Sequence, residues 1–376
     1  MPRSPDALKY LAPNWFTLVM GLTGLSLAWG QAAPLMGDMA TAGALVLAAA
    51  AALMFLVLLL FSVLRWQHHG AAVAADLRHP VRHAFVAALP ISLILLATAV
   101  VALGETGPWV GALWWLGSLW QFALTLWVLG RWLSADKAHA LSWPAVTPGL
   151  MLPVVGNVLA PLAGGALGAP GWAAAQFGVG VLLWPVVLAL LATRIAVQGL
   201  WAERLLPLTF ITVAPPAVIG SSVLVLGGPP VLAWMCWGAA LFFLLWSGHL
   251  VRRMLAQPFS IAFWSLGFPL AAFATLTLRL AGAPASCCSR SRSPSWRCRA
   301  RRNPLVPLDT MTPTRAAPRL PGDLFIWYVI ALELATFSVM FVAFAFTRTR
   351  HIELFNASQR QLDVSTGAIN TVLLLT

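Results

Sequence analysis

The sequence predicts an all-α membrane protein that crosses the bilayer many times. Of its 376 residues, 60% are hydrophobic and only 9% are charged, whereas an ordinary globular domain has about 25% charged residues. So few charges cannot cover a soluble core of this size, and the composition therefore argues against a soluble enzyme, a disordered chain and a disulfide scaffold. In a membrane protein the basic residues behind the net charge of +12 indicate which side of the bilayer each loop occupies. We therefore expect no nucleic-acid partner.

Apolar runs long enough to cross a bilayer occur nine times, since a spanning helix needs roughly 20 residues. No run has an ionisable residue in its middle, although Arg131, Arg194, Arg252 and Arg279 lie at run ends. The first run is longer than a signal-peptide core, and eight more follow it, so we expect no cleaved signal. In chain order the predicted spans are 14–30, 39–64, 83–103, 109–133, 143–162, 172–197, 207–226, 229–251 and 259–281.

The loops between these spans alternate in charge. The loops 31–38, 104–108, 163–171 and 227–230 carry no Lys or Arg, only Asp38 and Glu105. The positive-inside rule therefore predicts a multi-pass protein of the bacterial inner (plasma) membrane with a cytoplasmic N-terminus. The opposite ends hold eleven basic residues: Arg3, Lys9, Arg65, Arg78, Arg82, Arg131, Lys137, Arg194, Arg204, Arg252 and Arg253.

Helix-breaking residues favour the odd-numbered spans. Proline removes a helical donor and frees a carbonyl, which protein or water must satisfy within lipid. The pattern indicates kinked odd helices around an interior with straighter even helices outside; the alternative is that proline is simply common in membrane helices. Among even spans only the sixth has an internal proline, Pro185. The odd spans contain Gly21 and Gly24 (first), Pro90 (third), Pro153 (fifth), Pro215 and Pro216 (seventh) and Pro269 (ninth).

Four segments, 14–29, 152–164, 208–224 and 257–279, resemble the tellurite-resistance/dicarboxylate transporter family, which includes the plant slow-type anion channels. The most specific motifs are Ala-Pro-Pro at 214–216 and Phe-Trp-Ser-x-x-Phe-Pro at 263–269. The resemblance covers about residues 10–282. It implies ten helices arranged as five hairpins with pseudo-fivefold symmetry around a central pore, the odd helices innermost. Nine of the ten would be present here, and the resemblance implies a homotrimer.

The same resemblance implies a phenylalanine gate on the ninth helix, at Phe268. A ring across a narrow apolar pore would block hydrated ions, whereas the alternative for any of the 19 phenylalanines is core or lipid packing. The expected function is transport of small anions through an uncharged pore lined at Gly21, Gly24 and the odd-span prolines. A proton-coupled dicarboxylate or tellurite-related carrier remains an alternative, but the nine spans lack the intramembrane acid that proton coupling usually needs.

No catalytic, cofactor-binding or metal-binding site is predicted. Most histidines lie near the basic loops and none lies on facing helices within the membrane, as haem ligation would require. The cysteines Cys287, Cys288 and Cys298 match no zinc spacing.

Residues 283–310 break the pattern, with six arginines between 290 and 302. With nine spans and a cytoplasmic start this basic segment would lie outside the cell, against the charge rule. It is either a basic linker or, as we prefer, the product of a reading frame that slipped in a GC-rich gene. In the second case the tenth helix is encoded in another frame.

Residues 311–376 resemble the N-terminal part of haem-copper oxidase subunit III, in its short form associated with nitric oxide reductase. A Pro-Gly-Asp motif precedes an aromatic-rich apolar run that contains Glu333, an intramembrane acid that is either functional or merely packed. The resemblance implies one to two extra membrane helices, truncated. It also implies an alternative role as an accessory subunit that contacts the core subunits of a respiratory oxidase.

Overall fold

The computed structural model describes residues 8–133, 142–258 and 260–282, and within these ranges it contains helices and turns but no strand. The all-α prediction is therefore confirmed for this part of the chain. The segments 283–310 and 311–376, together with Glu333, lie outside the described residues.

Eight of the nine predicted spans are helical stretches long and apolar enough to cross a membrane. The fifth span differs, because its apolar helix is shorter, Pro148–Gly164, and it is interrupted between Val158 and Pro161. The first helix extends beyond the predicted end at 30 and continues to Met36, with Pro34 inside it. The even spans are uninterrupted: α3 (Asp38–His68), α6 (Pro108–Trp132), α9 (Pro170–Gln198) and α11 (Pro230–Gly248).

The odd spans share one backbone design, in which a 3-10 segment leads directly into an α-helix. A 3-10 helix rises about 2.0 Å per residue against 1.5 Å for an α-helix, so each odd span covers more depth than a pure α-helix of equal length. In order, the pairs are η1 (Pro13–Phe16) with α2 (Thr17–Met36), η2 (Arg82–Ala87) with α5 (Ala88–Ala102), η4 (Pro148–Met151) with α7 (Leu152–Val158) and α8 (Pro161–Gly164), η5 (Glu203–Val213) with α10 (Ala214–Val225), and η6 (Ile261–Leu266) with α13 (Gly267–Gly282).

The prolines of the odd spans lie where the 3-10 segment becomes an α-helix. Pro153 is the second residue of α7, Pro215 and Pro216 are the second and third of α10, and Pro90 and Pro269 are each the third of α5 and α13. Proline fits the first turn of an α-helix because its missing N–H would find no helical partner there. These prolines therefore mark the change of helix type and do not bend the middle of an α-helix. Pro185 in the even helix α9 and Pro34 near the end of α2 are helix-internal.

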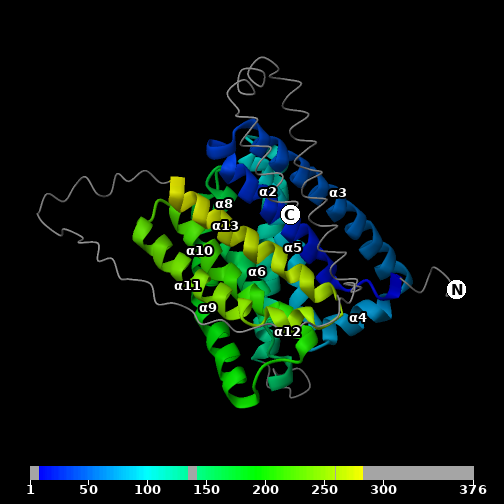
Figure 1. Cartoon of the computed structure of the whole chain (residues 1–376). Helices are drawn as coiled ribbons and strands as arrows, with labels where there is room; N and C mark the ends of the chain where they lie inside the picture. Colours follow the sequence, from blue (N-terminus) through cyan, green and yellow to red (C-terminus); the bar gives the residue numbers. More distant parts are fainter. Residues whose placement is uncertain (1–7, 134–141, 259, 283–376) are drawn as a thin grey trace, which may run out of the picture.

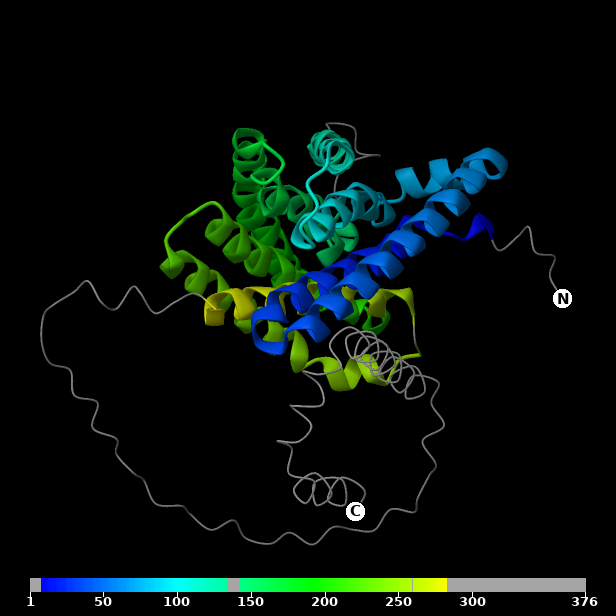
Figure 2. The same cartoon turned by 90° about the horizontal axis from the view of Figure 1, so that it is seen from above.

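The five odd spans form a closed ring. α2 packs against α5 and α13, α10 packs against α7 and α13, and α5 contacts both α7 and α8. Figure 2 shows the chain passing around the bundle from blue through cyan and green to yellow, so that α2 and α13 become neighbours. Each even helix covers the odd span before it: α3 on α2, α6 on α5, α9 on α7 and α11 on α10. The four described hairpins and the ring match the expected pseudo-fivefold order.

Basic residues gather at one end of this ring. The short helices α4 (Gly70–Arg78) and α12 (Val251–Leu255) lie at that end, in the lower part of Figure 1, and α8 lies toward the opposite end. We call these the basic end and the far end. Every inner span starts with its 3-10 segment at the basic end and runs toward the far end.

A buried polar network holds the broken fifth span in place. The side-chain amide of Asn157 donates to the Thr125 hydroxyl at 2.8 Å and to the carbonyl of Pro153 at 2.7 Å. Gln121 also donates to the Pro153 carbonyl, at 2.9 Å, and Gln176 donates to the Asn157 side-chain oxygen at 3.2 Å. Polar groups that find partners are favourable within a low-dielectric interior; of this network only the Gln121 side-chain oxygen has no partner among the described residues. The network thus ties α7 to α6 and α9 where α7 is too short to span alone.

Candidate functional site

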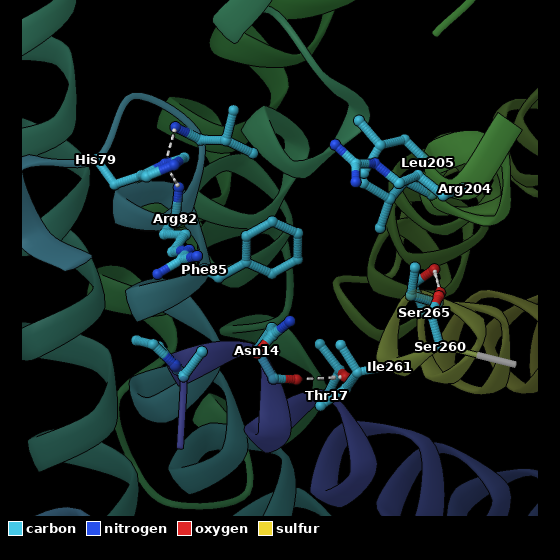
Figure 3. Close-up of a pocket in the computed structure, with 15 residues that line it drawn as sticks. Asn14, Thr17, His79, Arg82, Phe85, Arg204, Leu205, Ser260, Ile261 and Ser265 are labelled. Atoms are coloured by element: carbon cyan, nitrogen blue, oxygen red, sulfur yellow. Dashed lines mark hydrogen bonds between the residues drawn. The ribbon is translucent and has the colours of Figure 1, made fainter. Parts of the chain in front are cut away.

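A cavity of about 550 Å³ opens at the basic end of the ring. Figure 3 shows His79, Arg82 and Phe85 on one wall and Arg204 and Leu205 on the opposite wall. Asn14, Thr17, Ser260 and Ser265 add hydroxyl and amide groups, and the rest of the lining is apolar, including Val81, Leu208 and Ile261. The cavity therefore combines cationic side chains with neutral hydrogen-bonding groups, a lining that attracts anions.

A buried carboxylate binds Arg82 of one wall and a second arginine, Arg65, that does not line the cavity. Asp76, in α4, accepts hydrogen bonds from Arg65 at 2.7 Å and from Arg82 at 2.8 Å. Asp76 and Arg65 are buried, whereas the Arg82 side chain is half exposed. Arg65 also donates to the Lys9 carbonyl, which joins the N-terminal segment to the same cluster. One carboxylate thus holds two guanidinium groups, and the cluster remains positive.

The imidazole of His79 lies beside this cluster and is held in its neutral form. Burial, and secondarily the charge of Arg82, lower the pKa of His79 from its usual value, while Asp76 opposes the shift. Its Nδ1 accepts hydrogen bonds from the backbone N–H groups of Val81 and Arg82. An acceptor role at Nδ1 requires an unprotonated nitrogen. His79 therefore gains a positive charge at a lower pH than an ordinary histidine does.

Two small chambers of about 20 Å³ each continue from this cavity toward the far end. The nearer chamber shares Thr17 and Ser265 with the cavity. The farther chamber is lined by residues of all five inner spans, among them Gly24 and Ser221. Along α2 the lining passes from Thr17 to Gly24, so the cavity and both chambers follow the axis of the ring.

Phe268 lines both chambers and therefore lies between them. Its side chain is only 5% exposed. A Cβ atom on Gly24 would lie 3.0 Å from the Phe268 ring and 3.2 Å from the Cβ of Ala271, closer than ordinary contact. Glycine at position 24 therefore gives the ring its place on the axis.

Of the seven glycines and prolines predicted to line the pore, two lie on the axis. Gly24 and Pro269 line the chambers on the axis. Gly21 packs against α13, where its Cβ would lie 3.6 Å from the Cα of Gly267, and Pro153 lines a groove between α6 and α9. The other three, Pro90, Pro215 and Pro216, are buried at the starts of α5 and α10. They line neither the cavity nor the two chambers.

Sequence reasoning missed Asp76, because it counted only the basic residues of the loop between the second and third spans. A single acid among Arg65, Arg78 and Arg82 is the signal that could have revealed it. It also missed the polar network that includes Gln121. The signal that could have revealed this network is the spacing of Ser118, Gln121 and Thr125, which places three polar side chains on one face of α6. Among the described residues no group of three His, Cys, Asp or Glu side chains could hold a metal ion.

Comparison with known proteins places residues 10–290 in the family described as SLAC1, voltage-dependent anion channel. An uncharacterised transporter of Methanocaldococcus jannaschii is 26% identical over 71% of this chain and 83% of its own length. A tellurite resistance protein TehA homolog of Haemophilus influenzae is 26% identical over 70% of this chain and 79% of its own length. The S-type anion channel SLAH2 of Arabidopsis thaliana is 28% identical over 55% of this chain and 40% of its own length.

These relatives agree with the resemblance drawn for residues 10–282 and lend no support to an oxidase subunit III segment at 311–376. The match spans three quarters of the chain and includes all of the ring. The chain is a membrane protein that belongs to the voltage-dependent anion channel family.

Proposed function

We propose that this protein conducts small anions across the bacterial inner membrane, along the axis of the ring, and that the Phe268 ring is the gate. The single observation that supports the gate is that Phe268 lines the chambers on both of its sides. An aromatic ring in a narrow apolar passage excludes hydrated ions by size and by dewetting. The anion specificity is supported by the family match and by its named anion-channel relative.

The basic-end cavity would serve as the cytoplasmic entrance. Its cations, Arg82 and Arg204, concentrate anions without holding them in the narrow part of the path. A strongly binding charge next to the gate would slow release, since conduction needs weak binding. The two chambers on either side of Phe268 carry no charged side chain in their lining, which supports a passive pore.

A proton-coupled carrier finds less support. Along the described part of the axis, the titratable side chains that line the cavity and chambers are His79, Arg82 and Arg204, all at the basic end. Proton coupling usually places an acid or a histidine within the membrane. Uptake of malate that follows an imposed pH gradient would favour the carrier over the channel.

The test of the gate is Phe268→Ala, measured as chloride current in planar bilayers or chloride flux into liposomes. Removing the ring opens the passage between the chambers, so we expect the current to rise at least about tenfold. The matched control is Phe273→Ala on the same helix, because Phe273 stacks on Trp237 of α11, away from the axis. Folded F268A protein with wild-type current would remove the gate assignment, and equal increases in both variants would indicate general loosening of α13.

A further inference from the structure

Arg279 lies on the axis-facing side of α13, beyond the gate. Phe268, Ala272 and Thr275 of α13 line the farther chamber. Arg279 follows Thr275 by four residues and Phe268 by eleven, which is about three turns of an α-helix. These four side chains therefore form one stripe, and Arg279 is its last member, toward the far end.

Residues of α13 near Arg279 in sequence pack on the side of α11. Leu276 and Leu280 are buried in a cluster with Ala233 of α11. The hydroxyl of Thr277 accepts a hydrogen bond from Trp237 of α11, at 2.9 Å. These contacts direct the side of α13 that carries Leu276, Thr277 and Leu280 toward α11. Arg279 lies on a different face of α13, the one that also carries Phe268.

The guanidinium of Arg279 has unmet hydrogen-bonding capacity. Its Nε is buried and has no acceptor within residues 8–133, 142–258 and 260–282. The ion pairs in this part of the chain involve Arg65, Arg82 and Arg253. A buried donor of a charged group without a partner is costly. An anion at this position would satisfy both the donor and the charge.

One neutral polar residue, Gln31, belongs to the wall next to Arg279. On α2, Gln31 follows Gly24 by seven residues and Leu27 by four, so it continues the face of these two chamber-lining residues. Because α2 packs along α13, Gln31 and Arg279 belong to adjacent walls of the far end. A cation beside a neutral amide can bind a small anion without the tight grip of several charges.

We propose that Arg279 forms a binding subsite for small anions at the far end of the pore, with Gln31 on the adjacent wall. An anion that has passed the gate, or that enters from the far side, would bind the guanidinium before release. The proposal deepens the proposed channel function. It gives the path a charged site at each end, the basic-end cavity and Arg279, with an uncharged gate between them.

The first measurement is the thermal stability of the purified protein in detergent as chloride replaces gluconate at constant ionic strength. A ligand that binds the folded state raises its stability according to its affinity. Wild-type protein should be stabilised, and Arg279→Gln should raise the half-saturating chloride concentration about tenfold, as expected for losing one charged hydrogen-bonding partner. Arg279→Lys keeps the charge and should retain most of the affinity.

The matched control is Arg252→Gln, the same chemical change at an exposed position of α12 at the basic end. It should leave the chloride titration unchanged. Wild-type protein that chloride does not stabilise would overturn the subsite, even if R279Q failed to fold. Equal half-saturation in wild type and R279Q would overturn it as well.

The second measurement separates the subsite from the channel function. In the Phe268→Ala background, R279Q should raise the chloride concentration that gives half-maximal current by a similar factor. Current through F268A that is indifferent to R279Q, together with unchanged stabilisation, would leave the channel and overturn the subsite. A silent F268A protein whose chloride stabilisation still depends on Arg279 would overturn the channel and leave the subsite.

Discussion

The Phe268 ring and the backbone of Gly24 are so close that any side chain at position 24 would press on the ring. The family resemblance predicted a role for Phe268, and the pattern of helix-breaking residues predicted one for Gly24. Neither predicted that the two residues are in contact. Their relation depends on the packing of α2 against α13, which joins residues far apart in the chain. A residue contact of this kind follows from the closed ring and not from local sequence.

His79 makes the basic-end cavity sensitive to pH. Its pKa is lowered, chiefly by burial and then by Arg82, so it becomes charged at a lower pH than an ordinary histidine does. Protonation adds a positive charge to the cavity that already contains Arg82 and Arg204. We therefore expect the chloride current of F268A to rise, by about two- to threefold, as the pH on the basic side falls from 7 to 5.

His79→Gln should remove this rise, whereas His68→Gln should not, because His68 is exposed at the end of α3 and lines none of these spaces. The stability of the fold changes in the opposite direction from the current as the pH falls. Between the usual histidine pKa, about 6.5, and the lower folded value, the unfolded chain binds more protons, so the free energy of unfolding decreases as the pH falls. An H79Q channel with the wild-type pH profile would contradict the assignment.

The helical elements show what could be predicted from pattern and what could not. The apolar runs and loop charges located eight spans to within a few residues, because hydrophobic length is the dominant constraint in lipid. The prolines identified the odd spans correctly, but not the 3-10 segments before them. The polar network of Gln121 and Asn157 also escaped prediction, because its members lie on α6, α7 and α9 and meet only after folding.

Asp76 connects three elements, α3, α4 and η2, through Arg65 and Arg82. Asp76→Asn would leave the buried Arg65 without its counter-charge. Breaking a buried pair costs about 3–5 kcal/mol, which corresponds to a melting temperature lower by roughly 5–15 °C. Differential scanning fluorimetry of the purified protein in detergent measures this loss.

The matched control for Asp76→Asn is Glu203→Gln. Glu203 pairs with Arg253 at 3.4 Å, but both side chains are about half exposed, and exposed pairs contribute little. Its melting temperature should stay within about 2 °C of wild type. Equal losses in the two variants would show that Asp76 stabilises no more than a surface acid does.

At the scale of the whole molecule, the ring joins the first and ninth spans, and the farther chamber on its axis is lined by all five inner spans. Resemblance implied this order, and the contacts of α2 with α5 and α13 agree with it. The broken fifth span was not anticipated, because hydropathy counts apolar residues and does not register the interruption before Pro161. The polar network compensates for that interruption.

The asymmetry of charge between the two ends predicts the orientation of the whole bundle. With the basic end in the cytoplasm, a cysteine introduced at Glu105, in the exposed loop at the far end, should react with a membrane-impermeant maleimide in intact spheroplasts. A cysteine at Arg252, exposed at the basic end, should react only after the membrane is opened. The four native cysteines, Cys236, Cys287, Cys288 and Cys298, set the background, which is measured in protein without either substitution. The reverse labelling pattern would place Arg82 and Arg204 outside, and anions leaving the cell would then meet Arg279 first.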